Sequence, residues 1–506
     1  MTEPPRLASI RRVDWRFLLP EGAFTTVAVV GTADEPVLDG LGQVAGTVIR
    51  VDGEGPDDGA KADLVVTIAA SRTVLDRALR RVPPGGLIYA GAGPRRAAGR
   101  SSFREVTGAL RSAGFVDVHR SWHWPSEPAA LEIVPIDDAG AVRLALDRRR
   151  SGRIARVKAA MAGVALRLHV LDRIVPGWSV IGRRPWADGE PAVANALDPV
   201  RASLPDRRGA EASFVLLTPR FRASRHVVGL VLRPAGDGLA AVVKLARLSE
   251  DDGGIRREAE ALRRAGELGG SGVPEVLAFR GAPDSVLVES ALDGVVITGQ
   301  EVRAKPVAAI DEVEAWTRAL AGEPTGPQIP LRAFWAPAVE RIEGQLGPRT
   351  PLEVAPIARL TELTARILGR LDHVAIPAVV EHGDLAPPNL LRLRDGQLGV
   401  VDWEVADLQG LPLGDLLFFA AFLVSEPSDK NAVADPPAVR AALERQATHL
   451  DIDPGLIPAL QLVMWARWAD RQSGRFVDRG IPLEDRLPAR HLRSWSAAMA
   501  DLAFSD

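Results

Sequence analysis

The sequence contains no cysteine among its 506 residues. This absence excludes disulfide frameworks, thiolate zinc sites, iron–sulfur clusters and cysteine nucleophiles. Lysine is scarce as well, because it occurs only at positions 61, 158, 244, 305 and 430, and the remaining basic residues are arginine. A lysine buried in an apolar strand of this protein therefore needs a partner that explains it.

An excess of charge of one sign is also missing. Lysine and arginine total 62 against 65 aspartate and glutamate residues, which gives a net charge of -3. A protein that wraps nucleic acid usually carries a strong basic excess. We therefore expect no nucleic-acid partner.

Long hydrophobic runs are absent too. The longest, 159–166 and 416–424, fall far below the ~20 residues that span a bilayer. The first twenty residues lack the apolar centre of a signal peptide. We expect no membrane span and a cytoplasmic location. With ~150 residues per domain, the length predicts about three domains.

Strand-like and helical patterns alternate through the N-terminal part of the chain, which is typical of a parallel sheet. We predict an α/β Rossmann-like domain over residues 1–140. Its expected strands are 26–30, 47–52, 63–69 and 87–90, and its expected helices are 72–81 and 103–113.

Two segments of this domain, ALRRVPPGGLIYAG and LRSAGFVDVHR, resemble the second half of a class I S-adenosylmethionine-dependent methyltransferase. The resemblance covers residues ~24–137 and implies that Asp52 stands where the family places an acid on the cofactor ribose. The first turn, VVGTADEP, keeps only Gly31 of a glycine-rich loop. The domain is thus degenerate, and we expect a structural or partner-docking role in preference to methyl transfer.

Residues 141–205 are expected to connect two larger parts. An arginine-rich helix over 141–174 either faces solvent or contacts an anionic membrane surface or a partner. Prolines and glycines then indicate a linker of about thirty residues up to position 205.

A hairpin carries the main chemical prediction. Asp395 and Gly396 read as a two-residue turn between NLLRLR and QLGVVDW. Counting outward from this turn places Asn389 directly opposite Asp402, with Cβ atoms ~5 Å apart. An amide oxygen and a carboxylate suit Mg²⁺, which takes its other ligands from water and phosphate. Asp384, five residues before Asn389, can reach the same place and accept a hydroxyl proton.

The motif HGDLAPPN followed by VVDWE resembles the catalytic core of the aminoglycoside phosphotransferase and choline kinase group. The resemblance covers residues ~206–506 and implies an α+β bilobal protein-kinase-like domain that uses ATP and Mg²⁺. It makes Asp384 the catalytic aspartate, and it makes Asn389 and Asp402 the metal ligands. It also implies that His382 orders the loop and that Asp415 braces it.

The upstream sequence supplies further candidates for the nucleotide site. Lys244 lies in the apolar strand LAAVVKLARL, where ATP phosphates and a helix glutamate would pair with it. On the next helix, Glu258 shares the stripe of Ile255, Ala259 and Leu262, whereas Glu260 does not. We therefore predict that Glu258 is the partner of Lys244.

Two backbone segments complete the predicted nucleotide site. SVLVESALDG resembles the hinge between kinase lobes, whose backbone from Glu289 to Ala291 would bind adenine. The phosphate loop in LLTPRFRASRHVVGLVL has no glycine at its tip, so backbone N–H groups near Ser224 would cradle phosphate.

These observations predict a kinase-like N-lobe at 206–292 and a helical C-lobe at 293–506. The expected function is ATP- and Mg²⁺-dependent phosphorylation of a hydroxyl on a small molecule such as a sugar, an amino sugar or an aminoglycoside-like compound. Two alternatives stay open: a pseudokinase that binds nucleotide as a scaffold, and a bifunctional methyltransferase-kinase.

Overall fold

A computed structural model describes most of the chain. The described residues are 5–19, 24–51, 61–92, 101–148, 177–186, 214–218, 224–233, 238–248, 252–282, 285–322, 327–346, 355–425, 436–474 and 489–503. The chain forms two compact units. The sheet unit comprises residues 4–252 and 277–291, and the helical unit contains residues 253–276 and 292–506.

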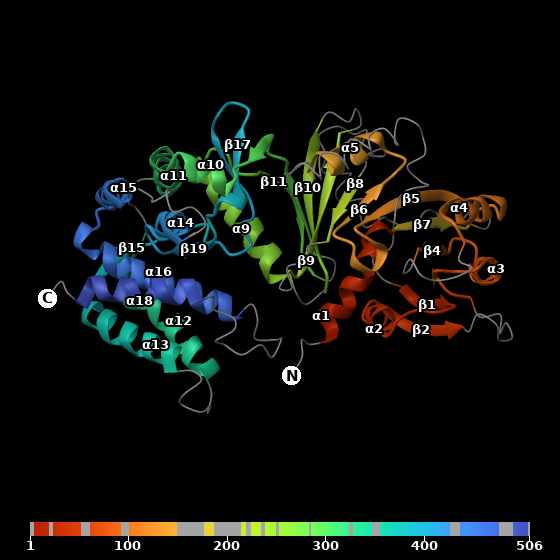
Figure 1. The fold of residues 1–506 in the computed structure, drawn as a ribbon, viewed down its shortest axis with the longest axis horizontal. Helices are drawn as coiled ribbons and strands as arrows, with labels where there is room; N and C mark the ends of the chain where they lie inside the picture. The colour runs from red at the N-terminus through yellow and green to blue at the C-terminus, as the bar shows by residue number, and fades with distance from the viewer. Residues whose placement is uncertain are drawn as a thin grey trace. The chain divides into compact units, whose positions relative to one another are not determined.

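The sheet unit is built on one twelve-stranded sheet in the order β11-β12-β10-β9-β8-β6-β5-β7-β4-β3-β1-β2 (Figure 1). Its strands are β1 (Phe24–Val30), β2 (Ala45–Val51), β3 (Leu64–Ile68), β4 (Leu87–Gly91), β5 (Val116–Trp124), β6 (Glu132–Pro135), β7 (Trp178–Arg183), β8 (Phe214–Leu217), β9 (His226–Leu232), β10 (Leu239–Ala246), β11 (Val276–Arg280) and β12 (Val286–Ser290). Its helical segments are α1 (Pro5–Ile10), η1 (Arg11–Leu18), α2 (Glu35–Gly42), α3 (Arg72–Arg81), α4 (Phe103–Ser112), η2 (Glu127–Ala129) and α5 (Ala139–Arg148).

The first four strands pair in parallel, with β1 between β2 and β3 and with β4 beyond β3. The four predicted strands and both predicted helices of this part are confirmed, with ends that differ by at most two residues. Ser71 and Ser102 explain where α3 and α4 begin, because each side chain accepts a hydrogen bond from the backbone of the first helical turn.

One expectation is wrong at residues 178–183. We expected a linker there, but β7 is a fully buried strand that pairs antiparallel with both β4 and β5. The sheet then continues through β6 and β8 into β9 and β10, so it crosses the predicted boundaries at 140 and 205. Of the predicted basic helix, α5 covers the first part, and residues 149–174 lie outside the described residues.

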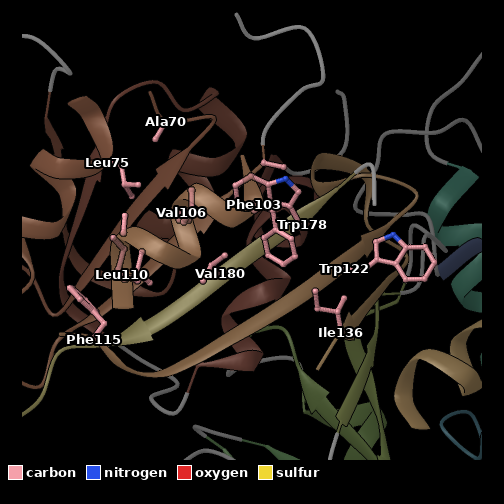
Figure 2. Packing of buried hydrophobic residues seen from close by; sticks show 14 of the residues in the cluster. Ala70, Leu75, Phe103, Val106, Leu110, Phe115, Trp122, Ile136, Trp178 and Val180 are labelled. Atoms are coloured by element: carbon pink, nitrogen blue, oxygen red, sulfur yellow. The ribbon is translucent and has the colours of Figure 1, made fainter. Parts of the chain in front are cut away.

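Both faces of the sheet carry buried hydrophobic side chains, because successive side chains of a strand point to opposite sides. On β1, Ala28 and Val30 join one core cluster, and Val27 and Val29 join the other. Figure 2 shows residues of the first cluster, where Phe103 of α4 stacks on Trp178 of β7 at 5.2 Å between ring centroids. The second cluster contains residues of α1, η1 and α2.

A buried carboxyl group in the sheet unit gives a prediction about pH. Burial is the main cause that raises the pKa of Glu127 to about 7, and the Tyr89 hydroxyl donates to it at 3.4 Å. Between pH 5 and about pH 7 the folded carboxyl keeps a proton that the unfolded chain has released, so the free energy of unfolding falls by about 2–3 kcal/mol as pH rises from 5 to 8. We expect Glu127→Gln to lose this decline in thermal unfolding scans. The exposed Glu35→Gln serves as the control, and an unchanged decline in Glu127→Gln would contradict the assignment.

The helical unit consists mainly of helices with short hairpins. Its helices are α9 (Gly253–Glu267), α10 (Gly299–Ala304), α11 (Pro306–Ala321), α12 (Leu331–Leu346), α13 (Ala355–Leu368), η4 (Gly369–Leu371), η5 (Pro387–Asn389), α14 (Gly414–Ser425), α15 (Pro436–His449), η6 (Pro454–Leu456), α16 (Ile457–Gly474) and α18 (Ala489–Ala503). Its strands are β13 (Gly294–Val296), β14 (Gln328–Pro330), β15 (Ala375–Pro377), β16 (Val379–Glu381), β17 (Leu390–Leu393), β18 (Leu398–Val400) and β19 (Asp407–Gly410). Helices α12, α13, α16 and α18 pack side by side (Figure 1). In the part of the chain that the structure describes, no helix combines the length and the apolar character that crossing a membrane requires.

Candidate active site

The loop between β16 and η5 carries Asp384, and α14 holds the start of this loop in place. Asp415, in the first turn of α14, accepts hydrogen bonds from the backbone N–H of His382 at 2.7 Å and of Gly383 at 2.8 Å. Burial, followed by the neighbouring charge of Glu381, raises the pKa of Asp415. The predicted contact between Asp415 and this loop is therefore confirmed.

His382 orders the same loop from inside. Its ring is fully buried, and Nδ1 accepts from the backbone N–H of Asp384 at 3.2 Å. Nε2 lies 3.0 Å from the carbonyl oxygen of Val401, to which it must donate because a carbonyl only accepts. Both ring nitrogens are thus engaged in holding the backbone. This geometry agrees with the expectation that His382 orders the loop and does not act as a base.

Gly383 is required by the shape of the loop. Its φ is +82°, a region that side chains with a Cβ rarely adopt. A Cβ at this position would lie 2.7 Å from Nη1 of Arg471 and 2.8 Å from the carbonyl oxygen of Val405. The backbone before Asp384 therefore packs directly against α16 and against the segment after Asp402.

Asn389 ends the short helix η5 and points its amide back to the loop. Its Nδ2 donates to the carbonyl oxygen of Asp384 at 2.8 Å. This bond orients the side chain and makes Oδ1 the atom that could ligate a cation. Asp384 and Asn389 are thus linked directly.

The hairpin register differs from the prediction by one residue. Leu390 pairs with Val400, Leu391 with Gly399 and Arg392 with Leu398. The prediction assumed a two-residue turn, but Leu393 N–H bonds to the carbonyl of Gln397 across Arg394, Asp395 and Gly396. Gly396 has a φ of +86°, which fits a three-residue turn that ends in a left-handed glycine. Consequently Asn389 pairs with Val401, whose N–H bonds to the Asn389 carbonyl at 3.0 Å, and Asp402 follows one residue later.

Asp402 lies where the strand ends, with a φ of +70°. The next residue, Trp403, is fully buried and donates its backbone N–H to Oε1 of Glu258 at 2.8 Å. Glu258 is itself buried on α9, whereas Glu260 is exposed, so the predicted helical stripe is confirmed. Glu258 therefore fixes the backbone beside Asp402.

The oxygen donors of Asn389 and Asp402 have the chemistry that Mg²⁺ prefers. Because Asn389 Nδ2 donates to the carbonyl oxygen of Asp384, the amide oxygen, and not the amide nitrogen, is the atom that can ligate a metal ion. Among the described residues, no cluster of three or more histidine, aspartate or glutamate side chains is arranged to hold a metal. A metal at Asn389 and Asp402 would therefore complete its shell with water and phosphate oxygens.

The other predicted nucleotide residues lie in the sheet unit. Lys244 is 4% exposed on β10. In the sheet it stands opposite Val228 of β9 on one side and Leu287 of β12 on the other. Glu289 is buried on β12, and the sheet unit ends at Ala291. Lys244 and Glu258 belong to different units, so their pairing stays a prediction.

Ser224 precedes β9 and is tied to a buried ion pair. Its carbonyl accepts from Arg247 Nη1 at 2.6 Å, and its hydroxyl donates to the carbonyl of His226 at 2.9 Å. Arg247 in turn binds Asp14 at 2.8 Å. The structure thus fixes Ser224 directly before the start of β9. The preceding residue of the predicted phosphate loop, Ala223, lies outside the described residues.

Next to the Asp384 loop, the helical unit contains a cavity of about 510 Å³. Its wall combines residues of α9, α12 and α16 with the segment 405–407. The charged residues of the wall are Arg257, Arg341, Arg467, Arg471, Asp407 and Asp470. No sequence pattern singles out these arginines as site residues.

Ion pairs engage part of this wall. Arg467 Nη2 lies 2.7 Å from Glu381 Oε2 and 3.0 Å from Asp407 Oδ2. Arg341 pairs with Asp470 at 2.6 Å. Arg471 comes no closer than 3.9 Å to Glu381, and burial lowers its pKa. The cavity wall is therefore more basic than acidic.

Comparison with known proteins gives one family match. Residues 230–454 match the model of the phosphotransferase enzyme family. These residues include every predicted site residue except Ser224. No curated protein sequence matches the chain.

Several solved structures are similar to part of this chain. A choline/ethanolamine kinase family protein from Mesorhizobium loti is 16% identical with a TM-score of 0.41, and the match covers 61% of this chain and 99% of that one. A fructosamine-3-kinase-type protein from Thermobifida fusca is 21% identical with a TM-score of 0.36, covering 55% and 91%. An aminoglycoside phosphotransferase from Streptomyces rimosus, in complex with ADP and streptomycin, is 19% identical with a TM-score of 0.36, covering 54% and 95%. From the family match, residues 230–454 have a kinase-like fold, and the protein is a phosphotransferase enzyme.

Proposed function

We propose that this protein transfers the γ-phosphoryl group of ATP to a hydroxyl of a small molecule such as a sugar, an amino sugar or an aminoglycoside-like compound. The observation that supports this most is the braced loop, in which Asp415 and His382 hold the backbone around Asp384 and Asp384 holds Asn389. The family match over residues 230–454 supports the same reaction class.

In the proposed reaction, the acceptor oxygen attacks the γ-phosphorus, the bond from γ-phosphorus to the β,γ-bridging oxygen breaks, and ADP leaves. Asp384 orients the acceptor hydroxyl and takes its proton. Asn389 and Asp402 would hold Mg²⁺, which when bound neutralises charge on the phosphate oxygens.

The remaining candidates position the nucleotide. Lys244 would contact the phosphates with Glu258 as its partner, and backbone N–H groups near Ser224 would cradle them. The backbone from Glu289 to Ala291 would bind adenine. Glu258 has a second task in this scheme, because its bond to Trp403 N–H fixes the backbone that follows Asp402.

A screen of acceptors tests the proposal. The full chain is incubated with Mg-ATP and with sugars, sugar acids, amino sugars, aminoglycosides or choline-like alcohols, and ADP release is measured. We expect release that depends on both Mg²⁺ and one acceptor class. Mg-ATP binding by calorimetry without transfer to any acceptor would instead support the pseudokinase alternative.

We further propose that residues 24–137 form a degenerate Rossmann-like layer related to methyltransferases. The parallel order β2-β1-β3-β4 supports this. At the turn after β1, Asp34 caps α2 and pairs with Arg12 at 2.9 Å, so a carboxylate already occupies the helix N-terminus. Asp52 lies outside the described residues. A structural role fits this arrangement, and saturable binding of S-adenosylmethionine would instead support the bifunctional alternative.

A further inference from the structure

The cavity beside the Asp384 loop has an unusual charge for a site that would receive a cationic alcohol. Its wall carries four arginines, Arg257, Arg341, Arg467 and Arg471, against Asp407 and Asp470. A cavity that binds several ammonium groups needs the opposite balance, because buried like charges repel.

The ion pairs show which of these arginines are already matched by acids. Arg467 is shared between Glu381 and Asp407, and Arg341 is paired with Asp470. These contacts use both aspartates of the wall. Arg257 and Arg471 are therefore the two arginines of the wall that pair with neither aspartate of the wall, although Glu381, Asp384 and Asp415 act on Arg471 from outside it.

Arg471 lies beside the start of the loop that carries Asp384. Its Nη1 is 2.7 Å from the place where a Cβ on Gly383 would be, directly before Asp384. Its side chain is 22% exposed, and its Nη1 lies 3.9 Å from Oε1 of Glu381. The negative charges of Glu381, Asp384 and Asp415 all act on it. Glu381 already accepts from Arg467 and from the Leu411 N–H.

Arg257 reaches the cavity from α9. Its Nε donates to the carbonyl oxygen of Glu404 at 3.0 Å, so a neutral backbone group holds it beside the cavity. A guanidinium group has five N–H donors in a planar fork that matches carboxylate and phosphate oxygens. Arg257 and Arg471 thus line one cavity and can each offer further donors to an anion.

From this arrangement we propose that the acceptor of the phosphotransferase carries an anionic group, a phosphate or a carboxylate, which Arg257 and Arg471 bind in the cavity next to Asp384. This inference rests on the proposed function. The acceptor is thus an alcohol acid or an alcohol phosphate, and its hydroxyl lies toward Asp384. Every residue of the cavity belongs to the helical unit, whereas Lys244, Ser224, Glu289 and Ala291 belong to the sheet unit.

Binding of small oxyanions tests the inference without knowledge of the acceptor. The full chain is saturated with Mg-ADP and titrated calorimetrically with inorganic phosphate, glycerate and glycerol 3-phosphate at constant ionic strength. Glycerol and ethanolamine are the neutral and cationic comparisons. We expect saturable binding of the anions only, weakened at least fivefold in Arg257→Gln and in Arg471→Gln.

A matched control comes from α12. Arg332 pairs with Asp372 and is 59% exposed, much as Arg341 is, but it does not line the cavity. Arg332→Gln should bind the anions as the wild type does. The inference is overturned when no anion binds, when ethanolamine binds better, or when Arg257→Gln binds anions unchanged. Arg257 is exposed on α9, so its variant keeps the test valid even where Arg471→Gln does not fold.

Two further results separate this inference from the proposed function. An anion site that competes with Mg-ADP, and whose variants change the KM for ATP, would assign the arginines to the nucleotide phosphates. ADP release with neutral acceptors and without anion binding would retain the kinase and refute the anionic acceptor. Anion binding without any phosphoryl transfer would retain the anion site and refute the proposed kinase activity.

Discussion

Asp384→Ala should lower kcat for ATP-dependent phosphoryl transfer by about 10²–10⁴-fold, the usual loss when a positioned proton acceptor is removed. The effect should fall on kcat more than on nucleotide affinity, because Asp384 is assigned to the acceptor hydroxyl and Lys244 to the phosphates. ADP release and calorimetric titration with Mg-ATP measure the two quantities separately.

Asp395→Ala is the matched control for this variant. Asp395 is an exposed aspartate in the turn after β17, and its carboxylate only accepts from Gln397 N–H at 2.9 Å. Its removal should leave activity within about twofold, as is usual for a surface site. Full turnover by Asp384→Ala, with a native circular dichroism spectrum, would contradict the role of Asp384.

Gly383→Ala should reduce kcat/KM by about 10²-fold, because small displacements of a catalytic group cost that much. A Cβ at a φ of +82° costs about 1–2 kcal/mol, and it also meets Arg471 Nη1 and the Val405 carbonyl at under 3 Å. The backbone before Asp384 must therefore shift. Steady-state kinetics and thermal unfolding measure the two effects.

Gly396→Ala separates backbone strain from collision. Gly396 has a φ of +86°, nearly that of Gly383, but nothing lies within 4 Å of its added Cβ. This variant should lose about 1 kcal/mol of stability and keep its activity. Equal activities of the Gly383 and Gly396 variants would show that the packing of the loop against Arg471 is unimportant for transfer.

Local patterns predicted most elements correctly. The helix at 72–81 has the predicted ends, and the structure shows that the Ser71 side chain caps its start. The stripe of α9 distinguished buried Glu258 from exposed Glu260. Such signals depend on neighbours three or four residues apart, and the sequence displays these directly.

In the hairpin, an error of one residue in the length of the predicted turn changed the residue predicted to lie opposite Asn389. Asp-Gly is compatible with a two-residue turn and also with a longer turn that ends in a left-handed glycine. The structure has the longer turn, so Asn389 pairs with Val401 instead of Asp402. The contact between Asp384 and Asn389 does not depend on the length of the turn, because Asn389 Nδ2 donates to the backbone carbonyl oxygen of Asp384.

Features that depend on distant residues could not be predicted. Strand β7 lies between β4 and β5, but its six residues stand within a proline- and glycine-rich stretch that indicated a linker. Arg257 and Arg471 line one cavity although more than two hundred residues separate them in the chain. No spacing rule connects such positions, so only the fold reveals the basic cavity.

The fate of the γ-phosphate tests the central claim most directly. Phosphorus NMR of the full chain with Mg-ATP and a pool of sugars, sugar acids, sugar phosphates, amino sugars and aminoglycosides follows it without a coupled enzyme. We predict that ATP converts to ADP and that a new phosphate-ester signal appears, and that Asp384→Ala produces neither. Intact ATP in the presence of every acceptor, while calorimetry shows Mg-ATP bound, would contradict phosphoryl transfer by this protein.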